Sequence, residues 1–217
     1  MIQLLSSFFL LFCQELTFGA VLGMGFLLLN VALFLELGYL CSFGLILNVL
    51  LKGIFQVPPS FVGSFSEYAF PSGHMQLSVL FYSFLAVYFP YTIFRCFVGV
   101  VLLGIGEALV YFHFHTVIDV LGGLVTALSL LYLYETFIKK LSLEWQLIVL
   151  TGLAGVMMRW NQMLYVNVPK HAGYALIILV ILTLIRPWVS RSVGLVHVTA
   201  CNQKTLGPHL QNKFGSK

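Results

Sequence analysis

Two short histidine motifs stand out from an otherwise apolar sequence. The first is Pro71-Ser72-Gly73-His74, which follows a stretch rich in proline, glycine and serine and precedes an apolar segment. Serine is a favoured N-cap residue, and glycine lets a ligand approach the backbone closely. A helix that begins here presents free N–H groups to an anion, and His74 is placed to donate a proton to a leaving oxygen. The same four residues also suit an ordinary helix start.

The second motif is His115-Thr116-Val117-Ile118-Asp119, which continues as Val120-Leu121-Gly122-Gly123. Residues four apart share one face of a helix, so we expect Asp119 to hold one ring nitrogen of His115. The other nitrogen then remains available as a nucleophile, in the manner of a base that is oriented by a carboxylate. The alternative is a buried His–Asp pair that stabilises a helix start.

Three further residues are candidates because ionisable groups are costly at membrane depth. Lys52, just before the proline-rich stretch, can pair with a phosphate or extend its ammonium group to the membrane interface. Glu107 lies eight residues before His115, on about the same helical face, and either tunes that histidine or stays protonated in an apolar setting. His113 is a second accessory candidate.

The composition indicates a protein whose solvent is mostly the lipid bilayer. Charged residues make up 8% of the 217 residues and hydrophobic residues 60%, whereas a soluble domain usually carries about 25% charged residues. The net charge of +4 does not indicate a nucleic-acid partner, because the cations cluster at segment ends and in the tail. The four cysteines have no zinc-type spacing, so we expect neither a disulfide nor a metal site.

The hydrophobic pattern predicts an all-α bundle of about six to seven transmembrane helices, since a span needs about 20 apolar residues. The expected spans are 16–34, 38–55, 74–93, 95–114, 117–137, 147–163 and 172–187. Residues 1–15 are apolar, but they are too short and too interrupted by polar residues for a full span, and they favour an interfacial or half-inserted helix. Residues 1–187 therefore form one transmembrane domain, with a core at about 16–137, extra spans at about 147–187, and a polar, basic cytoplasmic tail at 188–217.

The distribution of cations predicts the orientation in the membrane. If the loop 56–73 and the corner 114–117 share one side, that side carries three cations, Lys52, Arg159 and Lys170. The other side carries eight: Arg95, Lys139, Lys140, Arg186, Arg191, Lys204, Lys213 and Lys217. Short cytoplasmic segments collect Lys and Arg. We therefore expect both histidine motifs on the non-cytoplasmic face.

With these residues in view, the chain resembles the type 2 phosphatidic acid phosphatase superfamily of membrane phosphatases and phosphotransferases. The family pattern is K-x₆-R-P, then P-S-G-H, then S-R-x₅-H-x₃-D. The middle part is complete at residues 71–74, and the third part supplies His115, Asp119 and the glycine pair that follows. The resemblance covers about residues 40–135.

The resemblance implies a phosphohistidine mechanism that needs no metal or other cofactor. It implies that His115 attacks phosphorus, that Asp119 orients it, and that His74 protonates the departing alkoxide. Lys52, Ser72 and Gly73 would hold the phosphate oxygens. The substrate would be a lipid phosphate that the protein meets in the bilayer; the identity of the lipid and the oligomeric state stay open.

The two family arginines are absent. Counting from Lys52, the first family arginine falls on Pro59, and Ser60 stands in place of the following proline. Counting back from His115, the family Ser-Arg pair falls on Ala108 and Leu109. Neither Arg95 nor Arg159 is placed by sequence to substitute for them.

Three functions remain open. The first is a divergent lipid phosphatase acting on a monoester or a pyrophosphate. The second is a head-group transferase similar to the sphingomyelin synthases, whose S-G-H and H-x-H-x₃-D arrangement fits residues 72–74 and 113–119. The third is an inactive relative with a binding or structural role. We expect a bacterial inner membrane, because the spans are short and no long soluble insertion interrupts them.

Overall fold

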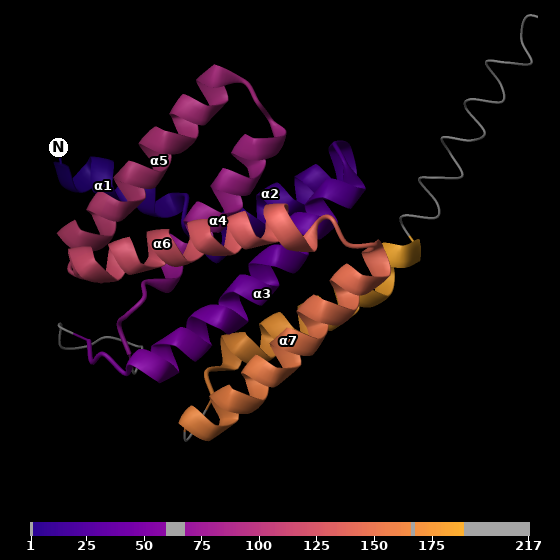
Figure 1. The fold of residues 1–217 in the computed structure, drawn as a ribbon. Helices are drawn as coiled ribbons and strands as arrows, with labels where there is room; N and C mark the ends of the chain where they lie inside the picture. The colour runs from indigo at the N-terminus through magenta and orange to yellow at the C-terminus, as the bar shows by residue number, and fades with distance from the viewer. Residues whose placement is uncertain (1, 60–67, 166–167, 189–217) are drawn as a thin grey trace, which may run out of the picture.

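The computed structural model describes residues 2–59, 68–165 and 168–188, and every regular element in these ranges is helical. Eight of these elements are named in chain order, and Figure 1 labels the α-helices among them. They are α1 (Ile2–Leu11), α2 (Glu15–Leu28), α3 (Val31–Phe55), α4 (Gly73–Tyr88), α5 (Thr92–Tyr111), α6 (Val117–Leu133), the π-helical turn η1 (Tyr134–Ile138) and α7 (Leu143–Leu164). A last helix covers Lys170–Trp188. The predicted tail lies, beyond its first residue, outside the described residues.

Helix α3 is the centre of the bundle. It packs against α2, α4 and α7, and in Figure 1 it runs diagonally between the α4 and α6 pair and the hairpin that α7 forms with the last helix. Its start differs from the expected spans, which placed residues 16–34 in one helix. The side chain of Asn30 accepts the N–H of Leu33 at 3.1 Å and caps α3, so the chain turns there instead.

The helices confirm a polytopic membrane protein. Five are long and apolar enough to cross a bilayer, and the bent pair α1 and α2, with 46° between its halves, brings the number to six if it counts as one span. Helix α4 has 16 residues, which at 1.5 Å per residue is about 24 Å, somewhat less than the hydrocarbon thickness of a typical bilayer.

The first helix packs along α5. The ring of Phe9 lies over Gly104, where a Cβ atom would come within 2.4 Å of it. The hydroxyl of Ser6 donates to the Glu107 carboxylate at 3.0 Å. Residues 1–15, expected at the interface, therefore include a helix that covers the outer side of α5.

The end of the bundle where α3 begins is held by a polar cluster. The Glu36 carboxylate accepts hydrogen bonds from the hydroxyls of Tyr134 at 2.6 Å and Tyr88 at 3.2 Å, and lies 3.8 Å from the Arg186 guanidinium. Lys139 donates to Tyr88. Arg186 and Lys139 thus lie at the opposite end of α3 from Lys52, as the distribution of cations along the sequence predicted.

Candidate active site

The P-S-G-H motif forms the first turn of α4. Ser72 is the N-cap residue, and its hydroxyl accepts the N–H of Met75 at 3.4 Å. The N–H groups of Gly73 and His74 open the helix and have no carbonyl of a preceding turn to bond to. They lie at the positive end of the helix dipole, which favours an anion. Ser72 is fully buried, so its contribution in this structure is the cap.

The second motif occupies a tight turn between α5 and α6. His113 adopts φ 58°, the N–H of Phe114 bonds to the carbonyl of Leu109 at 3.0 Å, and that of His113 bonds to Val110 at 3.0 Å. These two bonds are the Schellman pattern that ends a helix at a left-handed residue. The turn sends the chain back, so that His115 precedes the start of α6.

Asp119 is part of the cap of α6. Its carboxylate accepts the N–H of Thr116 at 2.8 Å, while its own N–H donates to the Thr116 hydroxyl at 3.2 Å, which is a capping box. His115 lies outside the helix. The expectation that helical spacing brings His115 and Asp119 together is therefore wrong. The capping turn instead points the Asp119 carboxylate back toward the histidine.

Backbone contacts join the two motifs. The N–H of Ser72 donates to the carbonyl of Asp119 at 2.9 Å. A Cβ atom at Gly123 would lie 2.6 Å from the Ser72 carbonyl, and one at Gly122 would lie 2.3 Å from the Phe70 ring. Glycines at both positions therefore let α6 approach the first turn of α4, and two helix N-termini meet at one place.

The two histidines face the same space. The ring centroids of His74 and His115 are 6.5 Å apart. The Nδ1 atom of His115 is buried and lies 3.8 Å from a carboxylate oxygen of Asp119, just beyond hydrogen-bond distance. Catalytic hydrogen bonds are often long before substrate binds. With Nδ1 turned to Asp119, Nε2 is the nitrogen left to act as a nucleophile.

Burial, and next to it the positive charge of Lys52, lower the pKa of His115 to about 4; Asp119 acts in the opposite direction. His115 lies on the turn between two candidate spans. Because its pKa is about 4, its imidazole is neutral at physiological pH. A neutral imidazole is the form in which histidine attacks an electrophile.

Lys52 lies at the electrostatic centre of the site. It is in the last turn of α3, and its charge acts on His74, His115 and also His171 at the start of the last helix. The packing of the last helix explains why His171 lies near Lys52. The next residue, Ala172, is fully buried in a cluster with Val49, which is three residues before Lys52. The positive charge of Lys52 near these rings favours a bound anion.

The two accessory candidates have structural partners. The Glu107 carboxylate accepts the hydrogen bond from Ser6 on α1, so it is directed toward the outer side of α5. His113 supplies the left-handed residue of the α5–α6 turn.

The structure adds three residues that the sequence reasoning did not place in the site. They are Asn48 and Gln76, whose side-chain amides are buried beside the P-S-G-H turn, and His171. Polarity within an apolar helix was the signal for the first two, because buried polar groups in a membrane need partners. The nearness of His171 depends on helix packing and has no local signal.

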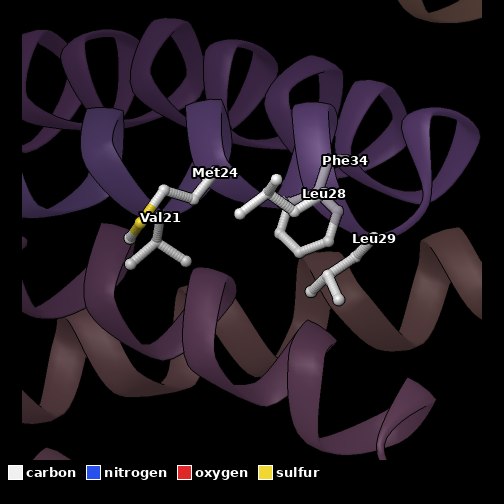
Figure 2. A pocket seen from close by; sticks show the side chains of 6 residues that line it. Val21, Met24, Leu28, Leu29 and Phe34 are labelled. Atoms are coloured by element: carbon white, nitrogen blue, oxygen red, sulfur yellow. The ribbon is translucent and has the colours of Figure 1, made fainter.

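A hollow of about 240 Å³ lies far from the histidines. Figure 2 shows it between α2 and the start of α3. It is lined by apolar side chains from Val21, Met24, Leu28, Leu29 and Phe34. Phe34 and Lys52 are 18 residues apart on α3, which corresponds to about 27 Å along the axis. The hollow is therefore separate from the site.

Comparison with known proteins shows the family of the chain. A family model described as the PAP2 superfamily matches residues 27–142, more than half of the chain. The chain belongs to the PAP2 superfamily. No curated protein and no solved structure matches it. The PAP2 match covers α3 to α6 and both histidine motifs, while α7 and the last helix lie outside it. Membership supports a lipid-phosphatase type of function for this integral membrane protein.

In this PAP2 chain, the positions that correspond to the two missing arginines lie in different surroundings, one in a loop and the other in the buried bundle. Pro59 is near the end of the described loop after α3. Ala108 and Leu109 are both buried in the bundle, and the Leu109 carbonyl accepts the N–H groups of the α5–α6 turn. Among the described residues, Lys52 and the N-termini of α4 and α6 bring positive charge or partial charge to this site.

Proposed function

We propose that the protein hydrolyses a lipid phosphate monoester or pyrophosphate through a phosphohistidine on His115, without a metal. The observation that carries the proposal is the arrangement of His115, with Nδ1 toward Asp119 and its ring 6.5 Å from that of His74. A near-attack contact is about 3–3.5 Å. This contact joins reacting atoms, and the separation of the ring centroids leaves room for one phosphoryl group between the two rings.

The reaction has two steps. The Nε2 atom of His115 attacks phosphorus, the bond to the lipid oxygen breaks, and His74 protonates that oxygen as it leaves. Water then attacks the phosphohistidine, His74 accepts its proton, and phosphate is released. Lys52 and the N–H groups of Gly73 and His74 stabilise the charge on the phosphoryl oxygens, which is usually the largest catalytic contribution.

The test is phosphate release by the purified full chain in detergent micelles, from a panel of lipid phosphates, with EDTA present. We expect release that His115→Gln abolishes, and a base-stable, acid-labile phosphate label on wild-type protein after rapid quenching. His115→Gln keeps a planar polar side chain, so loss of the label is not a packing effect. Release that persists in this variant would falsify the mechanism.

Transfer of a head group to a second lipid is the alternative that one observation favours. Among the described residues, Lys52 is the permanent cation whose charge acts on both motif histidines. A phosphodiester carries one negative charge, whereas a phosphate monoester carries about −1.5 to −2 at neutral pH. Incubation with two labelled lipids separates the functions: exchange of head groups without phosphate release supports the transferase, and neither product supports an inactive relative.

We further propose that the site opens on the non-cytoplasmic face of a bacterial inner membrane. The placement of Lys139 and Arg186 at the opposite end supports this orientation. Two single-cysteine proteins test it, one with Tyr111→Cys beside the site and one that keeps only Cys96 at the start of α5. In intact cells, a membrane-impermeant maleimide should label the first and not the second.

A further inference from the structure

A chain of side-chain amides connects α3 to the P-S-G-H turn. The Nδ2 group of Asn48 donates to the carbonyl of Pro71 at 3.2 Å and to Oε1 of Gln76 at 2.9 Å. The Nε2 group of Gln76 donates to the carbonyl of Gly44 at 2.9 Å. Asn48 is 5% exposed and Gln76 is 1% exposed, so water has little access to either amide.

The hydrogen bonds of Asn48 and Gln76 explain why each side chain is an amide and not a carboxylate. It ends at two main-chain carbonyls, those of Pro71 and Gly44, which can only accept hydrogen bonds. Asn48 must therefore direct its NH₂ group toward Pro71, and Gln76 must direct its NH₂ group toward Gly44. The Gln76 oxygen is left to accept the second hydrogen of Asn48. A carboxylate at either position places oxygen against oxygen.

The chain holds the turn that carries the anion-binding N–H groups. The Pro71 carbonyl directly precedes Ser72, so fixing it fixes the peptide planes that lead into Gly73 and His74. The Oδ1 atom of Asn48 lies beside Gly73, 3.0 Å from the position that a Cβ atom would take. The side of Gly73 that faces α3 is thus filled by this amide.

Asn48 cannot act on a substrate directly. Both hydrogens of its NH₂ group are engaged by protein acceptors, and its oxygen can only accept, so it offers no donor to a phosphate. Lys52 lies one turn further along the same helix, which means that α3 supplies the cation and aligns the turn opposite it.

We infer that Asn48 is a positioning residue, which sets the first turn of α4 against Lys52 through the Pro71 carbonyl. The inference rests on the proposed function, because it assigns the amide a role in phosphoryl transfer at that site. A displacement of about 1 Å can cost about 100-fold in rate, so the effect belongs in kcat.

The test compares two variants that each bury a carboxyl group in the bundle. Asn48→Asp removes the donor pair. Asn161→Asp on α7 is the matched control, because Asn161 is 0% exposed and neither atom of its amide has a hydrogen-bond partner among the described residues. Both proteins are purified as monodisperse fractions in detergent, and kcat and KM are measured on the lipid phosphate that wild type hydrolyses best.

We expect Asn48→Asp to lower kcat about 100-fold, while Asn161→Asp stays within about threefold of wild type. A purely structural role for Asn48 predicts equal losses in the two variants, and that result overturns the inference. If Asn48→Asp does not yield folded protein, Asn48→Ala takes its place, with an expected loss in kcat of about tenfold because the turn is released without a new charge.

Binding of inorganic orthovanadate separates this inference from the proposed function. We expect millimolar vanadate to raise the thermal midpoint of wild type, and to raise it less in Asn48→Asp than in Asn161→Asp. If wild type hydrolyses no lipid phosphate but shows this difference, the proposed function fails and the positioning role stands. If vanadate shifts wild type and Asn48→Asp equally, or shifts neither, the positioning role is overturned.

Discussion

At the residue scale, the chemistry of the site depends on how burial changes one imidazole. His115 is largely buried beside Asp119 and near Lys52. Water stabilises the charged imidazolium better than an apolar protein interior does, and a nearby cation disfavours it further. The histidine is therefore kept neutral and nucleophilic, although a carboxylate lies within 4 Å of it.

This environment predicts an unusually acidic limit of activity. His115 must be neutral to attack, so its contribution to kcat/KM, which reports the free enzyme, should be lost as the pH drops through about 4. An unperturbed histidine would place this fall near pH 6.5. In Lys52→Met the second cause of the shift is removed, so the pKa of His115 rises and the acid limb moves to higher pH.

The measurement is a pH profile of kcat/KM for wild type and Lys52→Met. The position of the acid limb does not depend on how tightly either protein binds substrate, so the lost phosphate contact does not obscure it. The second ionisation of a phosphate monoester, near pH 6, affects both profiles equally, so the comparison between the two proteins carries the test. An acid limb that stays in place or moves to lower pH in Lys52→Met contradicts its assignment to His115.

A second residue-scale prediction concerns the left-handed backbone of His113. At φ 58° a Cβ atom is disfavoured, whereas glycine is not. His113→Gly and His113→Ala both remove the imidazole, so they differ in the Cβ atom, which strains the left-handed turn and also restricts the unfolded chain. We expect the glycine variant to be more stable by about 1 kcal/mol, measured by denaturant unfolding in micelles. Equal stabilities would mean that the turn relaxes without strain.

At the element scale, the site exists because the N-termini of α4 and α6 approach closely. A close contact lies at Gly123, where the backbone of α6 meets the carbonyl of Ser72. The sequence motif that follows Asp119 is thus explained by packing: each glycine removes a side chain that would hold the two helices apart.

Gly123→Ala should separate the two motifs. The new Cβ would lie 2.6 Å from a main-chain oxygen, and main chain cannot rotate out of the way, so α6 must move. We expect a loss of about 1–3 kcal/mol in the free energy of unfolding together with a lower kcat. The control is Gly155→Ala on α7, where nothing lies within 4 Å, and where alanine should be neutral or stabilising by up to about 1 kcal/mol. A Gly123→Ala protein with wild-type kcat would show that close approach is unnecessary.

At the scale of the whole molecule, the bundle has a different polar arrangement at each end. One end gathers Lys52 and the histidines of the two motifs, and the other end pairs its cations with Glu36 and Glu135. The hairpin of α7 and the last helix contacts both ends, since Arg186 reaches Glu36 and Ala172 packs beside Val49. The segment outside the PAP2 match therefore helps to shape the region around Lys52.

The ion pair of Glu36 and Arg186 offers a test of how this hairpin is attached. Both side chains are mostly buried, at 15% and 12% exposed, so removing one partner leaves a poorly solvated charge. Arg186→Met should lower the free energy of unfolding by about 3 kcal/mol. The double variant Glu36→Gln with Arg186→Met should recover much of this loss, because no buried charge remains. A double variant no more stable than Arg186→Met alone would show that the pair does not attach the hairpin.

The sequence by itself determined the membrane class, the two histidine motifs and the helices that carry them. These follow from composition and from local rules: apolar length predicts spans, and Ser72 predicts the start of α4 that the structure shows. The break at Asn30 was missed, because one cap residue outweighs a continuous apolar pattern.

The tertiary structure alone decided how these parts meet. His115 precedes its helix, so its relation to Asp119 depends on a capping turn that spacing did not describe. Asn48 and His171 are 26 or more residues from either histidine of the two motifs in the chain, and only helix packing brings them to the site. The physical reason is that local signals act over a few residues of backbone, whereas a catalytic site is assembled by contacts between helices that are distant in sequence.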